Sequence, residues 1–195
     1  MHKRLSALLI AAGAIAALAS CGDPTALKAR LNNIEGEFSV HALNGSHPNT
    51  NNAIRVRSMS LVPATAQEAF DIAFDITDTG TVKIITTRAL TTENVPSTNR
   101  VGLRDSPERI FEEVIDPPRD LFIFDSLLVV PVGRVVLVDV LDLTCASEAI
   151  LGLNIKAKIR IDSIVLADRR IHMRMVSNPN CGFRELVPGG QKPGE

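Results

Sequence analysis

Residues 70–87 read FDIAFDITDTGTVKIITT, and this stretch decides the fold class. Apolar side chains at positions 70, 72, 74 and 76 alternate with smaller or polar residues, which is the two-residue period of a half-buried strand. The turn-forming segment 78–80 separates this run from a second one over 82–87. The stretch therefore predicts an antiparallel hairpin with Gly80 at positive φ, because three-residue hairpin loops favour glycine there.

The length of this loop also predicts the register of the hairpin. A three-residue loop places Phe74 opposite Ile84 and Asp75 opposite Lys83. We expect the Asp75–Lys83 pair to be exposed, and to contribute less than about 1 kcal/mol to stability.

Similar apolar runs recur along the chain. Breaks rich in turn residues at 131–134 and 166–168 predict two further hairpins, the first of them apolar on both faces and therefore in the middle of the sheet or under a long loop. We predict an all-β domain, an antiparallel sandwich or open barrel of about eight strands. The predicted strands are 38–43, 54–61, 70–77, 82–87, 121–130, 135–144, 153–165 and 171–176.

One short peripheral helix is predicted between these strands. Ser106 can cap it, Pro107 suits its first turn, and apolar residues at 110, 111, 114 and 115 form one stripe. We place this helix over 107–115. It lies in the longest connection of the chain, 88–120, which is the best place for a binding loop.

The N-terminal residues have the form of an export signal. His2, Lys3 and Arg4 give a positive start, and residues 5–19 carry no charge. A permanent membrane span needs about 20 apolar residues, and this run is shorter.

The junction Leu18-Ala19-Ser20-Cys21 is similar to the lipobox of bacterial lipoproteins, in which a branched apolar residue and two small residues precede the cysteine. The resemblance covers residues 1–21 only. It implies that Cys21 receives a diacylglyceryl group and becomes the first residue of the mature protein, where two or three acyl chains give stable membrane anchoring. Gly22 stands where an aspartate would favour the inner membrane, so an outer-membrane location is favoured if the bacterium has two membranes.

The tether after Cys21 carries one local pattern. Asp23 and Pro24 suit a helix start, and apolar residues at 27, 31 and 34 follow at helical spacing. We predict a short helix here, with Lys28 and Arg30 facing solvent or lipid headgroups.

These signals divide the chain into four parts. Removing Lys3 and Arg4 with the signal leaves 19 basic against 22 acidic side chains, a net charge of −3 that does not indicate nucleic-acid binding. The parts are a signal peptide (1–20), a lipidated cysteine and tether (21–36), a single β-rich domain (37–187) and a disordered tail (188–195).

The cysteine count predicts one disulfide. With Cys21 committed to lipid, Cys145 and Cys181 are the two cysteines left in a chain exported to an oxidising compartment. We predict that they pair, and that the bond is structural because the C-x-x-C spacing of redox pairs is absent.

The sequence predicts no catalytic site, metal or cofactor. The mature chain's three histidines, His41, His47 and His172, have no metal-ligand spacing. Asp71 and Asp75 on one strand would lie about 14 Å apart, too far to share a calcium ion. The chain also has no Trp or Tyr, the residues that build flat platforms for sugars.

The most organised polar pattern lies in the hairpin predicted over 153–176. Alternation puts the basic side chains of both strands on one face, with Asp162 opposite His172. Such a face could bind an anionic partner, and it would equally keep an exposed strand soluble and protect it from edge pairing. The candidate residues are Lys156, Lys158, Arg160, Arg170, His172 and Arg174.

We expect a lipid-anchored cell-envelope protein with a non-enzymatic binding or structural β domain. Its expected partners are the membrane, through the lipid on Cys21, and an anionic envelope component or another envelope protein. One alternative is a carrier of lipid or another apolar ligand, which requires an apolar cavity. The other is an envelope hydrolase with a dispersed site, which requires a cleft where a nucleophile, a base and an oxyanion donor converge.

Overall fold

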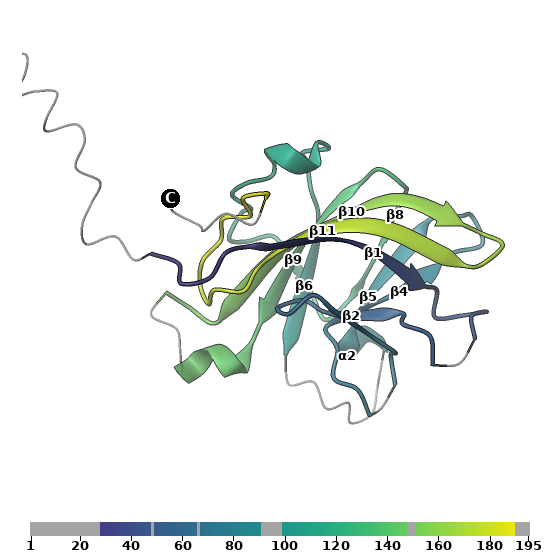
Figure 1. The fold of residues 1–195 in the computed structure, drawn as a ribbon, viewed down its shortest axis with the longest axis horizontal. Helices are drawn as coiled ribbons and strands as arrows, with labels where there is room; N and C mark the ends of the chain where they lie inside the picture. The colour runs from purple at the N-terminus through teal and green to yellow at the C-terminus, as the bar shows by residue number, and fades with distance from the viewer. Residues whose placement is uncertain (1–27, 48, 66, 91–98, 148–150, 190–195) are drawn as a thin grey trace, which may run out of the picture.

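The fold is an all-β sandwich of two antiparallel sheets, with six and five strands (Figure 1). This computed structural model describes residues 28–47, 49–65, 67–90, 99–147 and 151–189. The predicted antiparallel sandwich is confirmed, but the described residues form eleven strands where eight were predicted. The predicted signal peptide, Cys21 and residues 190–195 of the predicted tail lie outside the described residues.

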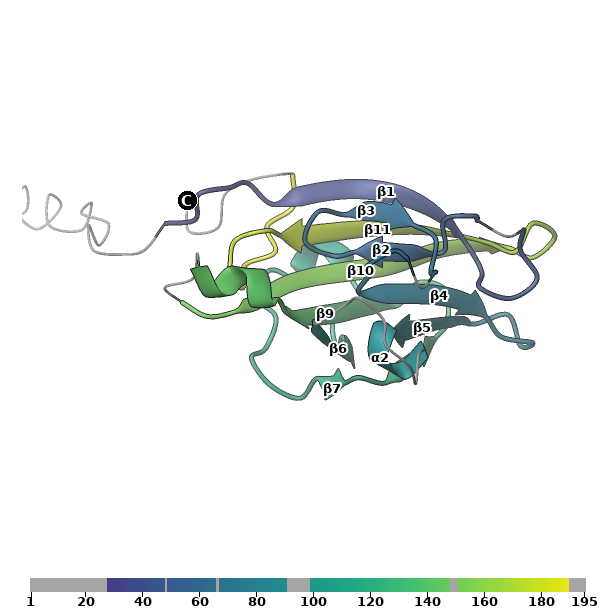
Figure 2. The ribbon, with the colours of Figure 1, turned by 90° about the horizontal axis from the view of Figure 1, so that it is seen from below.

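The six-stranded sheet has the order β1-β11-β10-β9-β6-β7, which Figure 2 shows from top to bottom. The first and last strands of the chain are neighbours in it. The described chain therefore begins and ends at the same end of the molecule (Figure 1). The strands are β1 (Ile34–His41), β6 (Arg100–Asp105), β7 (Ile123–Phe124), β9 (Val135–Leu141), β10 (Asn154–Val165) and β11 (Arg170–Asn178).

The five-stranded sheet has the order β3-β2-β4-β5-β8. Among the described residues, three short helical segments lie in the connections between strands. The strands are β2 (Ala53–Arg55), β3 (Ser60–Val62), β4 (Ile72–Ile76), β5 (Val82–Thr86) and β8 (Leu127–Val130). The helical segments are α2 (Thr87–Leu90) and the 3₁₀ turns η1 (Phe111–Glu113) and η2 (Leu143–Ser147).

The main core lies between the two sheets. Inward-facing residues such as Phe74 of β4, Ile84 of β5 and Met173 of β11 are fully or almost fully buried in one cluster. A second cluster covers the outer face of the six-stranded sheet, where Phe111 and Val114 pack on β9 and β11. The six-stranded sheet is thus covered on both faces, which matters for the charged residues it carries.

The β4–β5 hairpin forms as predicted. Gly80 has φ +74°, and Phe74 lies opposite Ile84 and Asp75 opposite Lys83. The expected exposed pair is wrong, because Asp75 is buried and bonds to Asn44 rather than to Lys83. The partner of the Asp75 carboxylate is a residue distant in sequence, which the local alternation pattern cannot predict.

Two predicted strands are each broken into two. The run 54–61 folds back on itself as the β2–β3 hairpin, with Met59 at positive φ. The run 121–130 changes sheet at Asp125, also at positive φ, so that β7 and β8 belong to different sheets. Continuous apolar character cannot distinguish one buried strand from two short ones.

The predicted hairpin at 131–134 is wrong, because β8 and β9 lie in different sheets. The segment is a crossover, held where Gly133 N donates to the carbonyl of Ile161 at 2.7 Å. The predicted position is wrong for β8, which is an edge strand, and holds for β9, which is an inner strand whose Val135 and Leu137 pack under Phe111 and Val114 of the long connection.

The predicted helix over 107–115 is also wrong. Only the 3₁₀ turn η1 forms, Ile110 is extended with φ −91° and ψ 118°, and Ser106 N donates to the carbonyl of Val135 instead of starting a helix. The surrounding connection is shorter than predicted, because β6 lies within it. Of the predicted stripe, Phe111 and Val114 are buried and Ile110 is exposed.

The folded domain starts earlier than predicted. β1 begins at Ile34, inside the predicted tether, and extends only to His41. The described part of the tether helix is wrong, because Arg30 N and Leu31 N both donate to the side chain of Asn180 instead of forming helical bonds. Part of the predicted tail is ordered as well, with Gly189 N donating to Glu35 at 2.5 Å.

Candidate functional site

The predicted basic residues do share one face of β10 and β11, the outer face of the six-stranded sheet. Arg160 lies opposite Arg174, and Lys158 lies opposite Val176. The predicted pairing of Asp162 with His172 is wrong, because a bulge places Ser163 opposite His172. The turn also has four residues, 166–169, where three were predicted.

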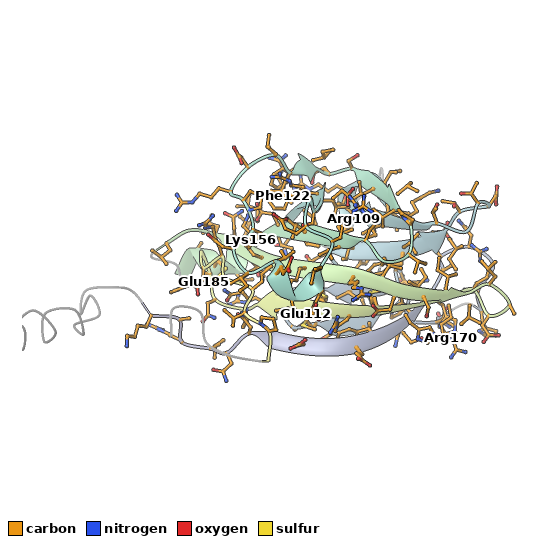
Figure 3. All side chains as sticks on the ribbon, turned by 90° about the horizontal axis from the view of Figure 1, so that it is seen from above. Arg109, Glu112, Phe122, Lys156, Arg170 and Glu185 are labelled. Carbon is orange, nitrogen blue, oxygen red and sulfur yellow. A yellow bond between two sulfur atoms is a disulfide. The ribbon has the colours of Figure 1, made fainter. Side chains whose placement is uncertain are left out.

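The face is not the open cationic surface that alternation suggested. Lys156 is 4% exposed and Lys158 is fully buried. The outer arginines lie beside carboxylates: Arg160 is 3.4 Å from Asp162, Arg170 is 3.2 Å from Asp168, and Arg174 is 2.9 Å from Glu112. In Figure 3 the turn that bears Glu112 lies over β10 and β11. The two lysines therefore cannot bind an anionic partner directly.

Lys158 supports the segment that covers the sheet. Its Nζ donates to the carbonyls of Phe111, at 2.7 Å, and Val114, at 2.8 Å, and lies 4.5 Å from the centre of the Phe111 ring. Burial lowers the pKa of Lys158 to about 8, against the weaker opposing effect of nearby Glu112. Because Lys158 occupies the carbonyl of Phe111, which an α-helix over 107–115 would bond internally, it favours the tight turn over the predicted helix.

Lys156 is buried beside a carboxylate on the neighbouring strand. It lies directly opposite Asp139 of β9, and its Nζ is 2.8 Å from Asp139 Oδ2. Asn154 donates to the other carboxylate oxygen at 2.7 Å, and the Phe122 ring centre lies 4.4 Å from Nζ. The hydrogen bond from Asn154 satisfies a carboxylate that burial would otherwise leave unsolvated, so the group is rigidly placed.

A cleft of about 430 Å³ opens over this group. One wall carries Arg184, whose guanidinium bonds to Asp116 at 2.9 Å and to the carbonyl of Pro117 at 3.2 Å. Figure 3 places Lys156, Phe122 and Glu185 toward one end of the molecule and Arg170 at the other. The lining residues are Asp116, Arg119, Asp139, Leu151, Gly152, Asn154, Lys156, Gly182, Phe183, Arg184 and Glu185.

Gly182 allows two of the segments that line the cleft to approach each other closely. Gly182 has φ +80°, and a Cβ there would lie 2.6 Å from the backbone nitrogen of Gly152. Its amide donates to the carbonyl of Asn154 at 2.9 Å. The two loops that border the cleft are therefore locked together at backbone level.

The predicted Cys145–Cys181 disulfide is confirmed, with the Cα atoms 5.6 Å apart. It joins η2, which follows β9, to the turn that follows β11. Since Gly182 comes directly after Cys181, the bond fixes the wall of the cleft as well as the C-terminal third of the domain.

The lining of the cleft is polar and charged. Carboxylates, guanidinium groups, an amine and an amide line the cleft, whereas its described lining residues include no Ser, Thr, Cys or His. Such a set can hold a polar ligand by charge and hydrogen bonds, but it lacks the nucleophile and imidazole base of a triad.

The other acidic candidates are separate. Asp71 accepts from the backbone of Val56 and the side chain of Asn99, and burial raises its pKa. Asp75 accepts from Asn44 and Arg169. Across the described part of the chain, no three His, Cys, Asp or Glu side chains gather as metal ligands. No helix formed by the described residues is long and apolar enough to cross a membrane.

Sequence reasoning found Lys156 but missed the rest of the cleft. Asp116, Arg119 and Arg184 lie on segments without regular strand pattern, so nothing local marked them. Asp139 could have been paired with Lys156 only if the β9–β10 register had been known. The loop between those strands has no turn signal that fixes it.

Comparison with protein-family models, with curated proteins and with solved structures finds no match for this chain.

Proposed function

We propose that this chain is a lipid-anchored protein of the bacterial cell envelope whose β sandwich is a non-enzymatic binding domain. The resemblance of residues 18–21 to a lipobox supports the anchor. The cleft over Lys156 and Asp139 supports binding, and it is the observation that carries this part of the proposal. A preorganised, charged cleft with no catalytic hydroxyl, thiol or imidazole in its described lining favours recognition over chemistry.

The ligand proposed for the cleft is a polar envelope component that bears a carboxylate. Arg119 lines the cleft and is exposed to solvent. The neighbouring acids Asp116 and Asp139 are held by Arg184 and Lys156, so the guanidinium of Arg119 is the group best placed to receive an anion. With no Trp or Tyr to stack on sugar rings, acidic peptide parts of a cell-wall polymer fit better than neutral glycans.

The two alternative functions receive less support. An apolar carrier needs a cavity between the sheets, but Ile, Val, Met and Phe side chains pack there as one buried cluster. A hydrolase of the Ser–His or Cys–His type needs a converging hydroxyl or thiol and an imidazole base, and the described lining of the cleft includes no Ser, Thr, Cys or His.

The proposed lipid anchor is tested by following how the precursor is cleaved and lipidated. Globomycin, which blocks lipoprotein signal peptidase, should cause the precursor to accumulate, and Cys21→Ser should abolish lipid addition. Mass spectrometry of the mature N-terminus gives the result directly. An unlipidated N-terminus at another residue would remove this part of the proposal.

Binding at the cleft is tested by isothermal titration calorimetry, in which soluble cell-wall glycopeptide fragments are titrated into the protein. Arg119→Ala should weaken binding by about tenfold to a hundredfold, because a hydrogen bond to a charged group contributes about 1.5–3 kcal/mol. Arg170→Ala is the matched control, since it removes the same charge at the far end of β11. If the wild type does not bind, or if both variants bind alike, the cleft is not the ligand site.

A further inference from the structure

Three separate segments meet at the turn formed by residues 180–182. The side chain of Asn180 accepts from Leu31 N at 2.9 Å and donates to the carbonyl of the same residue at 2.8 Å, which attaches the start of the described chain. The Cys181–Cys145 disulfide attaches η2. Gly182 packs on the backbone of Leu151 and Gly152.

Each of these three segments presents a leucine to solvent. Leu31 is 53% exposed, Leu143 is 50% exposed and Leu151 is 49% exposed. Lys28 and Arg30, also exposed, flank Leu31. Exposed apolar residues gathered around one turn and bordered by cations indicate a surface that contacts something apolar and anionic.

The length of the chain identifies what this surface contacts. Seven peptide steps separate Cys21 from Lys28, and they span at most about 25 Å when fully extended. From this end, β10 runs away for twelve residues, so the 166–169 turn lies about 36 Å further on. Figure 1 shows that turn at the opposite end of the molecule from the start of the described chain.

We propose that the end of the domain around residues 180–182 rests on the lipid leaflet once Cys21 is lipidated. Leu31, Leu143 and Leu151 enter the interfacial region, and Lys28 and Arg30 lie at anionic headgroups. This inference rests on the proposed lipid anchor. Leu151 and Gly182 also line the cleft. In this orientation the cleft therefore opens beside the membrane surface.

The absence of tryptophan from the chain makes the orientation measurable. Leu151→Trp introduces a single indole at the proposed contact. Leu166→Trp is the matched control, since Leu166 is 62% exposed and lies in the turn at the far end of β10. The lipidated full-length mature proteins are reconstituted into vesicles of phosphatidylethanolamine and phosphatidylglycerol whose acyl chains are brominated, and tryptophan quenching is compared.

Quenching of the Leu151→Trp protein should exceed that of the Leu166→Trp protein by about twofold or more, because interfacial side chains lie about 5–10 Å into the headgroup and acyl boundary. Leu143→Trp provides a second probe if Leu151→Trp misfolds by circular dichroism. Vesicle-bound, lipidated protein with equal quenching at both ends would overturn this orientation and leave the anchor intact. Protein without lipid at its N-terminus would overturn the anchor itself.

Discussion

Lys156 and Lys158 stand two residues apart on β10 and are buried by different means. Lys156 faces a carboxylate, whereas Lys158 is held by two backbone carbonyls. An ammonium group taken from water needs its lost hydrogen bonds replaced, and both arrangements do so. The two lysines should therefore respond differently to mutation and to pH.

Removing one member of the Lys156–Asp139 pair should be more damaging than removing both. Lys156→Met leaves a buried carboxylate with only Asn154 as partner, and should lower the free energy of unfolding by about 3–5 kcal/mol. Lys156→Met combined with Asp139→Leu should recover most of this loss. Urea unfolding of the wild type, the two single variants and the double variant measures the coupling, and additive losses would show that the pair acts as two independent residues.

Lys158 should make stability depend on alkaline pH. Its pKa is about 8 in the folded protein against an ordinary value of 10.5, so between these values only the unfolded chain binds the proton. The free energy of unfolding therefore rises with pH across that window, and the penalty on the folded state is full below it. Across the whole window, from about pH 8 to pH 10.5, the free energy of unfolding should rise by about 3 kcal/mol.

The measurement compares the wild type with Lys158→Met by urea unfolding at several pH values. The difference in unfolding free energy should shift in favour of the wild type between about pH 8 and pH 10.5. The chain has no tyrosine to titrate in the same range, and other lysines cancel in the difference. Parallel pH profiles would contradict the buried titration of Lys158.

Among the secondary-structure elements, the sequence pattern predicted correctly those that are held by contacts between residues close in sequence. The β4–β5 hairpin follows from alternation and from Gly80, both of which lie within the hairpin itself. The helix over 107–115 fails because Lys158, more than forty residues later, takes the carbonyl of Phe111. The sheet change at Asp125 was missed for the same reason, since neighbours distant in sequence determine it.

Gly80 and Gly182 have the same backbone conformation but different surroundings. Substituting each by alanine therefore distinguishes the conformational cost of a side chain from its steric cost. A Cβ added to Gly80, at φ +74°, would meet no atom within 4 Å, whereas a Cβ added to Gly182, at φ +80°, would meet backbone atoms at 2.6 Å. Gly80→Ala should lower stability by about 1 kcal/mol, the left-handed penalty alone. Gly182→Ala should lower it by about 3 kcal/mol or more, because backbone must shift. Urea midpoints under oxidising conditions check this, and equal losses would refute the close approach.

At the scale of the whole molecule, the sequence predicted the composition of the site better than its exposure. Alternation placed Lys156, Lys158 and Arg160 on one face correctly. It could not show that η1 and the C-terminal segment cover that face, because those contacts pack Phe111 and Leu186 onto strands far away in sequence. A charged residue on a strand therefore indicates solvent exposure only when no other segment of the chain packs over it.

The disulfide should be a major stabiliser of the domain. The paired cysteines are 36 residues apart, and closing a loop of that length restricts the unfolded chain by about 4 kcal/mol in the chain-entropy model. Reduction should lower the free energy of unfolding by that amount. The variant with Cys145→Ala and Cys181→Ala should match the reduced wild type and be insensitive to reductant, and an unchanged midpoint on reduction would contradict the prediction.

The pairing of β1 with β11 sets an order of events for the emerging chain. Ile34 lies opposite Ser177, so the first strand to leave the ribosome or a translocation channel can complete its sheet only after nearly the entire polypeptide has followed. Until then β1 is an unpaired strand, exposed to aggregation, and the long-range closure makes folding slow. The six-stranded sheet of this domain is thus completed only once β11 has emerged.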